Sequence, residues 1–186
     1  MRILVYDLVS ENRKRIQKSK FRKKVRAIRV KATEMLHQLG VRCTESVILV
    51  PDTRAGSVDA VINKINGMFF KVLSDAESAL GITLPRPVIR LLDITEDQFA
   101  VFRELAERRL YEALGANIHR VSKIAKSLAD RKSPRKVENL ISSLKKLKRE
   151  WLNIRRHAID LGINVQSDID RLVKMIDGVI ASIRGQ

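Results

Sequence analysis

Short apolar runs divide the first half of the chain into three predicted strands. Runs of about four to eight apolar residues, rich in branched and aromatic side chains and bounded by polar residues, are typical of buried strands. The first run, Ile-Leu-Val-Tyr, is followed immediately by Asp7, and the second has Glu45-Ser46 at its middle. The second run therefore predicts either one long strand or two short strands joined at that dipeptide. The predicted strands cover residues 2–9, 41–50 and 88–94.

Between these strands, apolar residues recur every three or four positions, which predicts two amphipathic helices. The first helix is expected to begin near Asn12, after a polar turn, and to end at Gly40. The second is expected to begin at Ser57 as its N-cap and to end at Gly81. The order strand–helix–strand–helix–strand over about 94 residues predicts an α+β sandwich.

After residue 94 the pattern changes to three long helices. Thr95 and Gln98 have the spacing of a capping box, which predicts a helix from 96 to about 132 with a weak point at Gly115. Ser133-Pro134 predicts the next start and Gly162 its end. The apolar seams are predicted at Tyr111, Leu114, Ile118, Val121, Ala125 and Leu128; at Val137, Leu140, Leu144, Leu147, Trp151, Ile154, Ala158 and Leu161; and at Ile169, Leu172, Ile176, Val179 and Ile183.

These seams repeat at alternating spacings of three and four residues, the pattern of helices that pack along their length. Short turns between such helices predict an antiparallel helical bundle or coiled-coil hairpin over residues 95–186, following an α/β domain over 1–94. The fold class is therefore expected to be α+β. Apolar seams of this kind usually form a core, and dimerisation through one of them is the other interpretation.

The charge of the chain indicates a class of function. Its net charge is +16, and the basic residues are clustered. Residues 13–31 contain eleven basic residues and no acidic one. Like charge at that density opposes compaction, so an external polyanion is the expected partner, and nucleic acid is the commonest. The other interpretation is a solvated helix face that maintains solubility. The nucleic-acid contacts predicted in this segment are Arg13, Lys14, Arg15, Lys18, Lys20, Arg22, Lys23, Lys24 and Arg26.

A second basic cluster surrounds the predicted turn between the first two long helices. Its members lie outside the apolar seams and are expected to face solvent, where they suit phosphate contacts along a duplex or a structured RNA. Long exposed helices also need charge for solubility, which is the alternative here. The predicted contacts are Arg120, Lys123, Arg131, Lys132, Arg135, Lys136, Lys145, Lys146 and Arg149.

Composition excludes several other classes. Aromatic residues make up 4% of the chain, so we expect contacts to the phosphate backbone in preference to base stacking. Cys43 is the only cysteine, and the three histidines lack metal-ligand spacing, so no disulfide framework, metal site or cofactor is expected. No apolar run approaches the ~18 residues of a membrane span, and we expect a cytoplasmic protein without a membrane partner.

The first 94 residues resemble the small ferredoxin-like CRISPR-associated proteins that accompany the spacer integrase, and their relatives among virulence-associated protein D toxins. The resemblance lies in Val5-Tyr6-Asp7-Leu8, in residues 11–15 (Glu-Asn-Arg-Lys-Arg), and in Gly40-Val41-Arg42 with Glu45-Ser46-Val47. It implies a ferredoxin-like sandwich that forms a homodimer and binds duplex nucleic acid. It also implies a candidate catalytic residue, Asp7, because some members are metal-dependent nucleases that use the corresponding aspartate. Residues 95–186 have no counterpart in that family pattern.

Three functions follow from these observations. The first is a dimeric protein that binds nucleic acid without sequence preference, with DNA expected in preference to RNA. The second is an endonuclease that uses Asp7 with Mg²⁺ or Mn²⁺, although one carboxylate is few for such a site unless a dimer supplies a second. Without that chemistry, Asp7 is expected to pair with a nearby lysine or arginine. The third is a scaffold protein whose helical part binds a partner.

Overall fold

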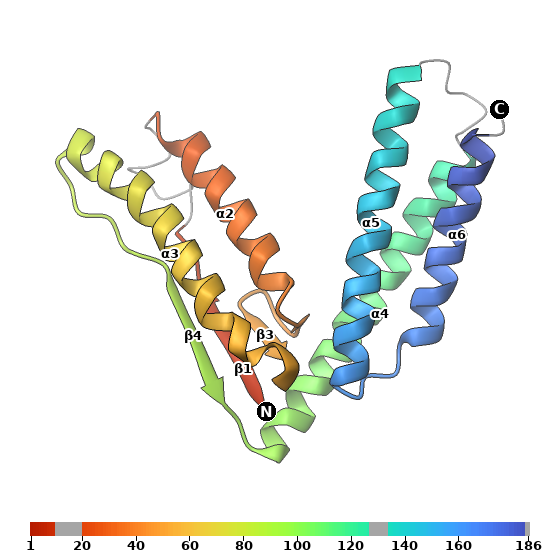
Figure 1. Cartoon of the computed structure of the whole chain (residues 1–186), viewed down its shortest axis with the longest axis horizontal. Helices are drawn as coiled ribbons and strands as arrows, with labels where there is room; N and C mark the ends of the chain where they lie inside the picture. The colour runs from red at the N-terminus through yellow and green to blue at the C-terminus, as the bar shows by residue number, and fades with distance from the viewer. Residues whose placement is uncertain (10–19, 127–133, 185–186) are drawn as a thin grey trace. The chain divides into compact units, whose positions relative to one another are not determined.

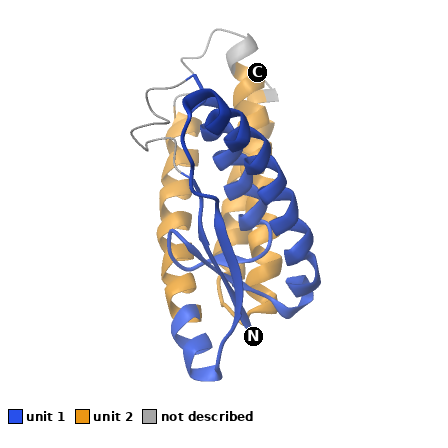
Figure 2. Cartoon of the chain, turned by 90° about the vertical axis from the view of Figure 1, so that its left-hand side faces the viewer, with its two compact units in different colours: residues 1–102 blue, residues 103–186 orange. Residues whose placement is uncertain are grey.

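The structure is a computed structural model that describes residues 1–9, 20–126 and 134–184, with the backbone alone for 134–136 and 184. Its fold class is α+β, as predicted from the sequence. The chain divides into two compact units, residues 1–102 and 103–186, which are coloured separately in Figure 2. The sequence predicts a boundary after residue 94, whereas these units divide inside a helix that begins at Glu96.

The first unit contains a four-stranded sheet in which every pair of neighbouring strands is antiparallel. The strand order is β2-β3-β1-β4, so that β1 lies inside the sheet and β2 and β4 form its edges (Figure 1). The register places Leu4 opposite both Ile48 of β3 and Leu91 of β4. The strands are β1 (Arg2–Asp7), β2 (Val41–Arg42), β3 (Val47–Val50) and β4 (Val88–Asp93).

The second extended segment forms two short strands, because the chain turns back between Arg42 and Val47. This is the two-strand alternative that Glu45-Ser46 left open. The hairpin requires glycine at position 40, since a Cβ there would lie 2.0 Å from the carbonyl oxygen of Leu49. Gly40 therefore allows the end of the preceding helix to approach the backbone of β3.

Two helices cover one face of this sheet, α2 (Arg22–His37) and α3 (Asp52–Leu80) (Figure 1). The expected start of the first helix near Asn12 lies outside the described residues. The predicted start of α3 at Ser57 is wrong, because the helix already begins at Asp52. Pro51 is extended, with ψ of 146°, and its carbonyl accepts the first turn's hydrogen bond from the Arg54 amide at 2.9 Å. The carboxylate of Asp52 also suits the positive end of the helix. Gly81 ends α3 in the left-handed conformation, as predicted, with φ of 62°.

The core of the first unit lies between the sheet and these two helices. Alternate side chains of β1 and β3, among them Leu4 and Ile48, point to this side, because successive side chains of a strand face opposite sides. They meet one apolar stripe from each helix, represented by Leu36 and Phe69. All four of these side chains are fully buried.

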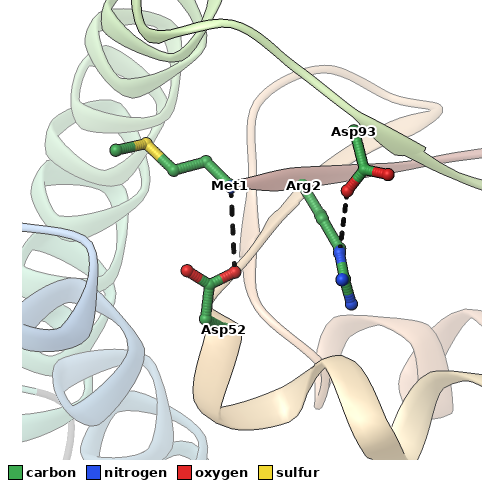
Figure 3. A network of polar contacts seen from close by, with 4 residues as sticks. All are labelled: Met1, Arg2, Asp52 and Asp93. Atoms are coloured by element: carbon green, nitrogen blue, oxygen red, sulfur yellow. Dashed lines mark hydrogen bonds and ion pairs between the residues drawn. The ribbon is translucent and has the colours of Figure 1, made fainter.

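Ion pairs at the start of β1 connect it to its surroundings (Figure 3). The Arg2 side chain pairs with Asp93, which lies opposite in β4, at 2.9 Å between Nε and Oδ1. The amino group of Met1 lies 3.8 Å from a carboxylate oxygen of Asp52. Because both pairs are exposed to solvent, each contributes little to stability.

Long helices make up the second unit (Figures 1 and 2). The capping box at the start of α4 is confirmed, since the side chain of Gln98 accepts from the Thr95 amide at 3.0 Å and that of Thr95 accepts from the Gln98 amide at 3.3 Å. The α4 helix runs through Gly115 without interruption. Gly162, with φ of 65°, lies in the short turn that joins α5 to α6 and makes them antiparallel. The helices are α4 (Glu96–Lys126), α5 (Pro134–Asp160) and α6 (Gln166–Arg184).

The predicted apolar seam is confirmed for α6, is buried or half-buried in α5, and is wrong in part for α4, where Leu128 lies outside the described residues. In α6 all five predicted positions are buried, and in α5 Leu144, Trp151 and Ala158 are buried. In α4, Tyr111 is 46% exposed and Ala125 is also exposed, whereas Leu110 is buried. The period of a straight helix is 3.6 residues, so an assignment in steps of three and four can begin one residue late. Tyr111 instead donates a hydrogen bond from its hydroxyl to the carbonyl of Asn164, 3.0 Å away.

Among the described residues, no helix has an apolar stretch of the length needed to cross a lipid bilayer.

Candidate nucleic-acid interface

The surface of α2 and the turn before it carry seven of the fourteen described lysines and arginines of the first unit. Five predicted contacts in this segment are exposed, and none of the five forms an ion pair with a carboxylate among the residues that the structure describes. The single acidic residue of the helix, Glu34, lies near its far end. These five side chains are therefore directed to solvent. They are Lys20, Arg22, Lys23, Lys24 and Arg26.

This placement opposes the stability of the helix itself. The N-terminal end of a helix carries a partial positive charge, which favours acidic residues in the first turn and disfavours basic ones. The first turn of α2 contains Arg22, Lys23 and Lys24 and no acidic residue, and Phe21 provides no side-chain cap. A protein gains no folding energy from this arrangement. A bound anion would be attracted by the helix end and by the side chains together.

Phe21 anchors this basic segment to the core. Its side chain is 5% exposed and belongs to the apolar core between the helices and the sheet. The ammonium groups of Lys20 and Lys24 lie 5.6 and 5.8 Å from the centre of its ring, within the range of a cation–π contact. The ring therefore holds the charged ends of two lysines at the start of the helix, where both residues are exposed.

Three arginines share one side of α2 and a fourth lies on the sheet face that α2 covers; we call these four residues the arginine flank. Arg22, Arg26 and Arg29 follow one another at spacings of four and three residues, so they share one side of α2 over about 10 Å of its length. Arg42 lies on edge strand β2 in the same row as Ile48 and Leu4, and it therefore points to the sheet face that α2 covers. The flank consists of Arg22, Arg26, Arg29 and Arg42.

His37 connects the two parts of the arginine flank. It lies two four-residue steps after Arg29 along α2, and its Nε2 is 3.3 Å from the hydroxyl of Tyr6. Burial lowers the pKa of His37, and the charge of Arg42 lowers it further. Burial also raises the pKa of Tyr6, an effect that Arg42 opposes. At neutral pH the imidazole is therefore uncharged, although Arg42 acts on it.

Sequence reasoning identified part of this flank and missed the rest. It predicted Arg22 and Arg26 as contacts, but not Arg29, Arg42 or His37. The spacing of Arg29 from Arg26 and Arg22 was sufficient to place it on the same side of the helix. Arg42 and His37 could not be found in this way, because their position depends on the register of the β2–β3 hairpin and on the contact with Tyr6.

In the second unit the basic residues of α5 divide into paired and unpaired groups. Lys148 pairs with Asp177 at 2.7 Å, and Arg155 pairs with Asp170 at 3.0 Å. Lys148 and Arg155 are seven positions apart on α5, and Asp177 and Asp170 are seven positions apart on α6. This is expected for two antiparallel helices in a constant register. These pairs therefore join α5 to α6.

Other basic residues of α5 face away from this contact. Lys145, Arg149 and Arg156 follow one another at spacings of four and seven residues, are exposed, and form no ion pair with a described carboxylate. Lys146 lies 3.8 Å from Glu150 in an exposed pair, which leaves its charge only weakly compensated. Lys145, Lys146 and Arg149 were predicted as contacts from the sequence, and all three are exposed.

The unpaired cations of α4 lie near the end of the helix that leads toward α5. Arg120, Lys123 and Lys126 are exposed, and no acidic residue occurs between 116 and 126. Residues 116–149 as a whole contain eleven basic and two acidic residues. The rest of the second unit has no comparable excess, so its positive charge is concentrated toward one end of the helices.

Several predicted contacts cannot be placed. Arg13, Lys14, Arg15, Lys18, Arg131 and Lys132 lie outside the described residues, and the side chains of Arg135 and Lys136 are not described.

Asp7, the candidate catalytic residue, is the last residue of β1 and lies opposite Val88 of β4. Its side chain is exposed and makes no hydrogen bond or ion pair with the described residues, so the expected pairing with a lysine or arginine is not found among them. Within the same part of the chain, no group of three or more histidine, cysteine or acidic side chains is arranged to hold a metal ion.

Comparison of the chain with protein-family models, with curated proteins and with solved structures finds no match in any of the three.

Proposed function

We propose that this protein binds nucleic acid through its phosphate backbone, without strong sequence preference. The observation that carries the proposal is the basic surface of α2, where five exposed lysines and arginines lack carboxylate partners among the described residues and stand at the positive end of a helix. This arrangement is unfavourable for the isolated protein. It becomes favourable when phosphates neutralise the charges and release condensed counterions.

The arginine flank arranges part of this basic surface as a row along α2. Guanidinium groups bind phosphate oxygens in a bidentate manner, and the flank presents them at successive turns of one helix and on the neighbouring strand. A row of this kind suits successive phosphates of one strand. The unpaired residues Lys145 and Arg149, together with Lys123 and Lys126, would provide a second set of phosphate contacts on the other unit.

Contacts to the backbone are favoured over base stacking. Phe21 and Tyr6, the aromatic residues adjoining the basic surface of α2, are 5% and 6% exposed and belong to the core. Base stacking on a protein requires an accessible aromatic face. The proposed ligand is therefore a duplex or another structured nucleic acid, with DNA expected first.

The test compares two variants that remove the same charge from different places. Arg22→Gln/Arg26→Gln removes two cations of the arginine flank, whereas Arg2→Gln/Arg86→Gln removes two cations that pair with Asp93 and Glu77. With a mixed-sequence DNA duplex, we expect the first variant to bind more weakly and its log–log salt slope to be smaller by about 2. The control should keep the wild-type slope. Equal losses in both variants would mean that net charge, and not this surface, determines binding.

We also propose that the first unit has a ferredoxin-like fold and that the second is a helical bundle. The strand order β2-β3-β1-β4, with α2 before β2 and α3 between β3 and β4, supports the first part. The buried seams of α5 and α6 support the second. A relationship of the first unit to the CRISPR-associated and virulence-associated families is part of the same proposal.

A homodimer completes the proposal. Edge strand β4 carries two exposed apolar side chains, Val88 and Leu92, which are 50% and 43% exposed. An exposed apolar edge strand offers backbone groups and side chains for pairing with another strand. Sedimentation equilibrium of the whole chain measures this directly, and a monomer at all concentrations would contradict it.

A further inference from the structure

The two parts of the arginine flank meet at His37. This histidine is not among the phosphate contacts predicted from the sequence. We propose that His37, with Arg29, Arg42 and the hydroxyl of Tyr6, forms a phosphate subsite that takes up one proton when a nucleic-acid phosphate binds. This inference rests on the proposed function, because the phosphate is that of the bound nucleic acid. It adds one defined position at which binding changes the chemical state of the protein.

The position of His37 brings three elements together. It is near the C-terminal end of α2, it contacts Tyr6 of β1 at 3.3 Å, and Arg42 of β2 points to the same sheet face as Tyr6. Arg29 lies on the same side of α2, two helical turns before His37. Tyr6 is 6% exposed, His37 is half-buried, and Arg42 is exposed. A ligand can therefore reach Arg42 and His37 from solvent, with Tyr6 behind them.

Burial, and after it the charge of Arg42 from β2, lowers the pKa of His37 in the free protein and so favours its neutral form. Burial raises the pKa of its partner Tyr6, whereas Arg42 from β2 and Arg29 from α2 oppose this increase and Glu45 from the hairpin adds to it. A phosphate bound to Arg42 would offset the effect of that arginine on the imidazole. Its negative charge then favours the protonated form of His37, because an opposite charge nearby stabilises an ionised group.

The hydrogen bond to Tyr6 can accommodate this proton. A neutral imidazole can accept at Nε2 from the tyrosine hydroxyl, whereas a protonated one must donate there. The hydroxyl can act as donor or acceptor, so it can accept from the charged ring while its own hydrogen is released for another partner. The pair can therefore keep its hydrogen bond when His37 is protonated, and the tyrosine hydroxyl then provides one more donor near the phosphate.

The experiment measures affinity against pH at constant salt, with a mixed-sequence DNA duplex and an RNA duplex of the same sequence as probes. For the wild type we expect affinity to rise by about tenfold from pH 8 to pH 5, which corresponds to an increase of one unit in the pKa of His37 on binding. His37→Gln should lose this rise, so that its affinities at pH 5 and pH 8 become nearly equal. His119→Gln is the matched control, because His119 is an exposed histidine on α4 beside the basic residues of the other unit.

A second measurement guards against a folding defect in His37→Gln. The imidazole resonances of the wild-type protein, titrated with and without duplex, report the pKa of His37 directly, and we expect it to be higher in the complex. Binding with an unchanged His37 pKa, or a pH profile that is the same in wild type and His37→Gln, would overturn the subsite and leave the proposed function intact. Failure to bind either duplex at any pH and at low salt would overturn both.

Discussion

At the scale of single residues, the lysines and arginines of α5 have two separate roles. Lys148 and Arg155 pair with acidic residues of α6, whereas Lys145 and Arg149 face solvent without a described carboxylate partner. The sequence predicts which residues lie outside the apolar seam, but it does not predict which of them find a partner. That difference depends on the register of two helices, and it separates residues that stabilise the fold from residues available to a ligand.

Replacement of Lys145 and Lys148 distinguishes these roles. Lys145→Gln should lower the log–log salt slope of DNA binding by about 1 and leave stability unchanged, because it removes one phosphate contact. Lys148→Gln should leave the slope unchanged and lower the free energy of unfolding by less than about 1 kcal/mol, because its pair with Asp177 is partly exposed. The measurements are a salt titration of affinity and urea unfolding followed by the fluorescence of buried Trp151. Equal slopes in the two variants would contradict the division.

Glu77 is the residue whose ionisation should affect the stability of the first unit. One carboxylate oxygen accepts the Leu84 amide at 2.8 Å and the other accepts Arg86 at 2.7 Å. The Leu84 amide, with help from Arg86, lowers the pKa of this carboxyl. The folded protein then releases its proton more readily than the unfolded chain, so stability is greatest above the ordinary glutamate value of about 4.3 and falls as pH drops through the lower folded value.

This acid sensitivity should be smaller in Glu77→Gln, which keeps an acceptor for the Leu84 amide but has no charge to titrate. Hydrogen exchange of the β1 and α3 amides, measured across the acid range, reports the stability of this unit. Asp75→Asn is the control, because Asp75 is exposed on the same helix and has no partner among the described residues. An acid profile that is identical in wild type and Glu77→Gln would refute the assignment.

At the scale of elements, the sequence predicted the types and most of the boundaries, and its errors have identifiable causes. The strands and the glycine-terminated helix α3 were found because their apolar patterns are regular and Gly81 adopts a positive φ. The start of α3 was missed because Asp52 and its neighbours carry no apolar stripe. The seam of α4 was assigned one residue late at Tyr111, since helical periodicity does not match a strict heptad.

The β2–β3 hairpin provides a test at this scale. Gly40→Ala would force a Cβ to within 2.0 Å of the Leu49 carbonyl, so the strand or the end of α2 must move. We expect a loss of about 3 kcal/mol in the stability of this unit, in the range of overpacking substitutions. Gly67→Ala is the matched control, because a Cβ added at this position of α3 would meet nothing within 4 Å, and alanine should stabilise the helix by about 1 kcal/mol. Hydrogen exchange of the β3 amides measures both, and a neutral Gly40→Ala would contradict the close approach.

At the scale of the whole molecule, the excess positive charge is divided between two places. One is α2 with the turn before it, extended by Arg42, and the other is the part of α4 and α5 within residues 116–149. The sequence predicted both clusters, because charge density can be read without a structure. The arginine flank could not be predicted without the sheet register. Arg42 lies outside α2 along the chain, and only the pairing of β2 with β3 shows that it points to the sheet face that α2 covers.

The most direct test of the central claim is the salt dependence of nucleic-acid affinity for the wild-type chain. The four arginines of the flank with Lys145 and Arg149, counted without the other proposed lysine contacts, give a minimum of six phosphate contacts. For a DNA duplex, six contacts predict a slope of about −5 in log Kobs against log salt concentration. A slope of that size would support contacts between DNA phosphates and these clustered lysines and arginines. A slope near zero, or no binding at low salt, would contradict the account.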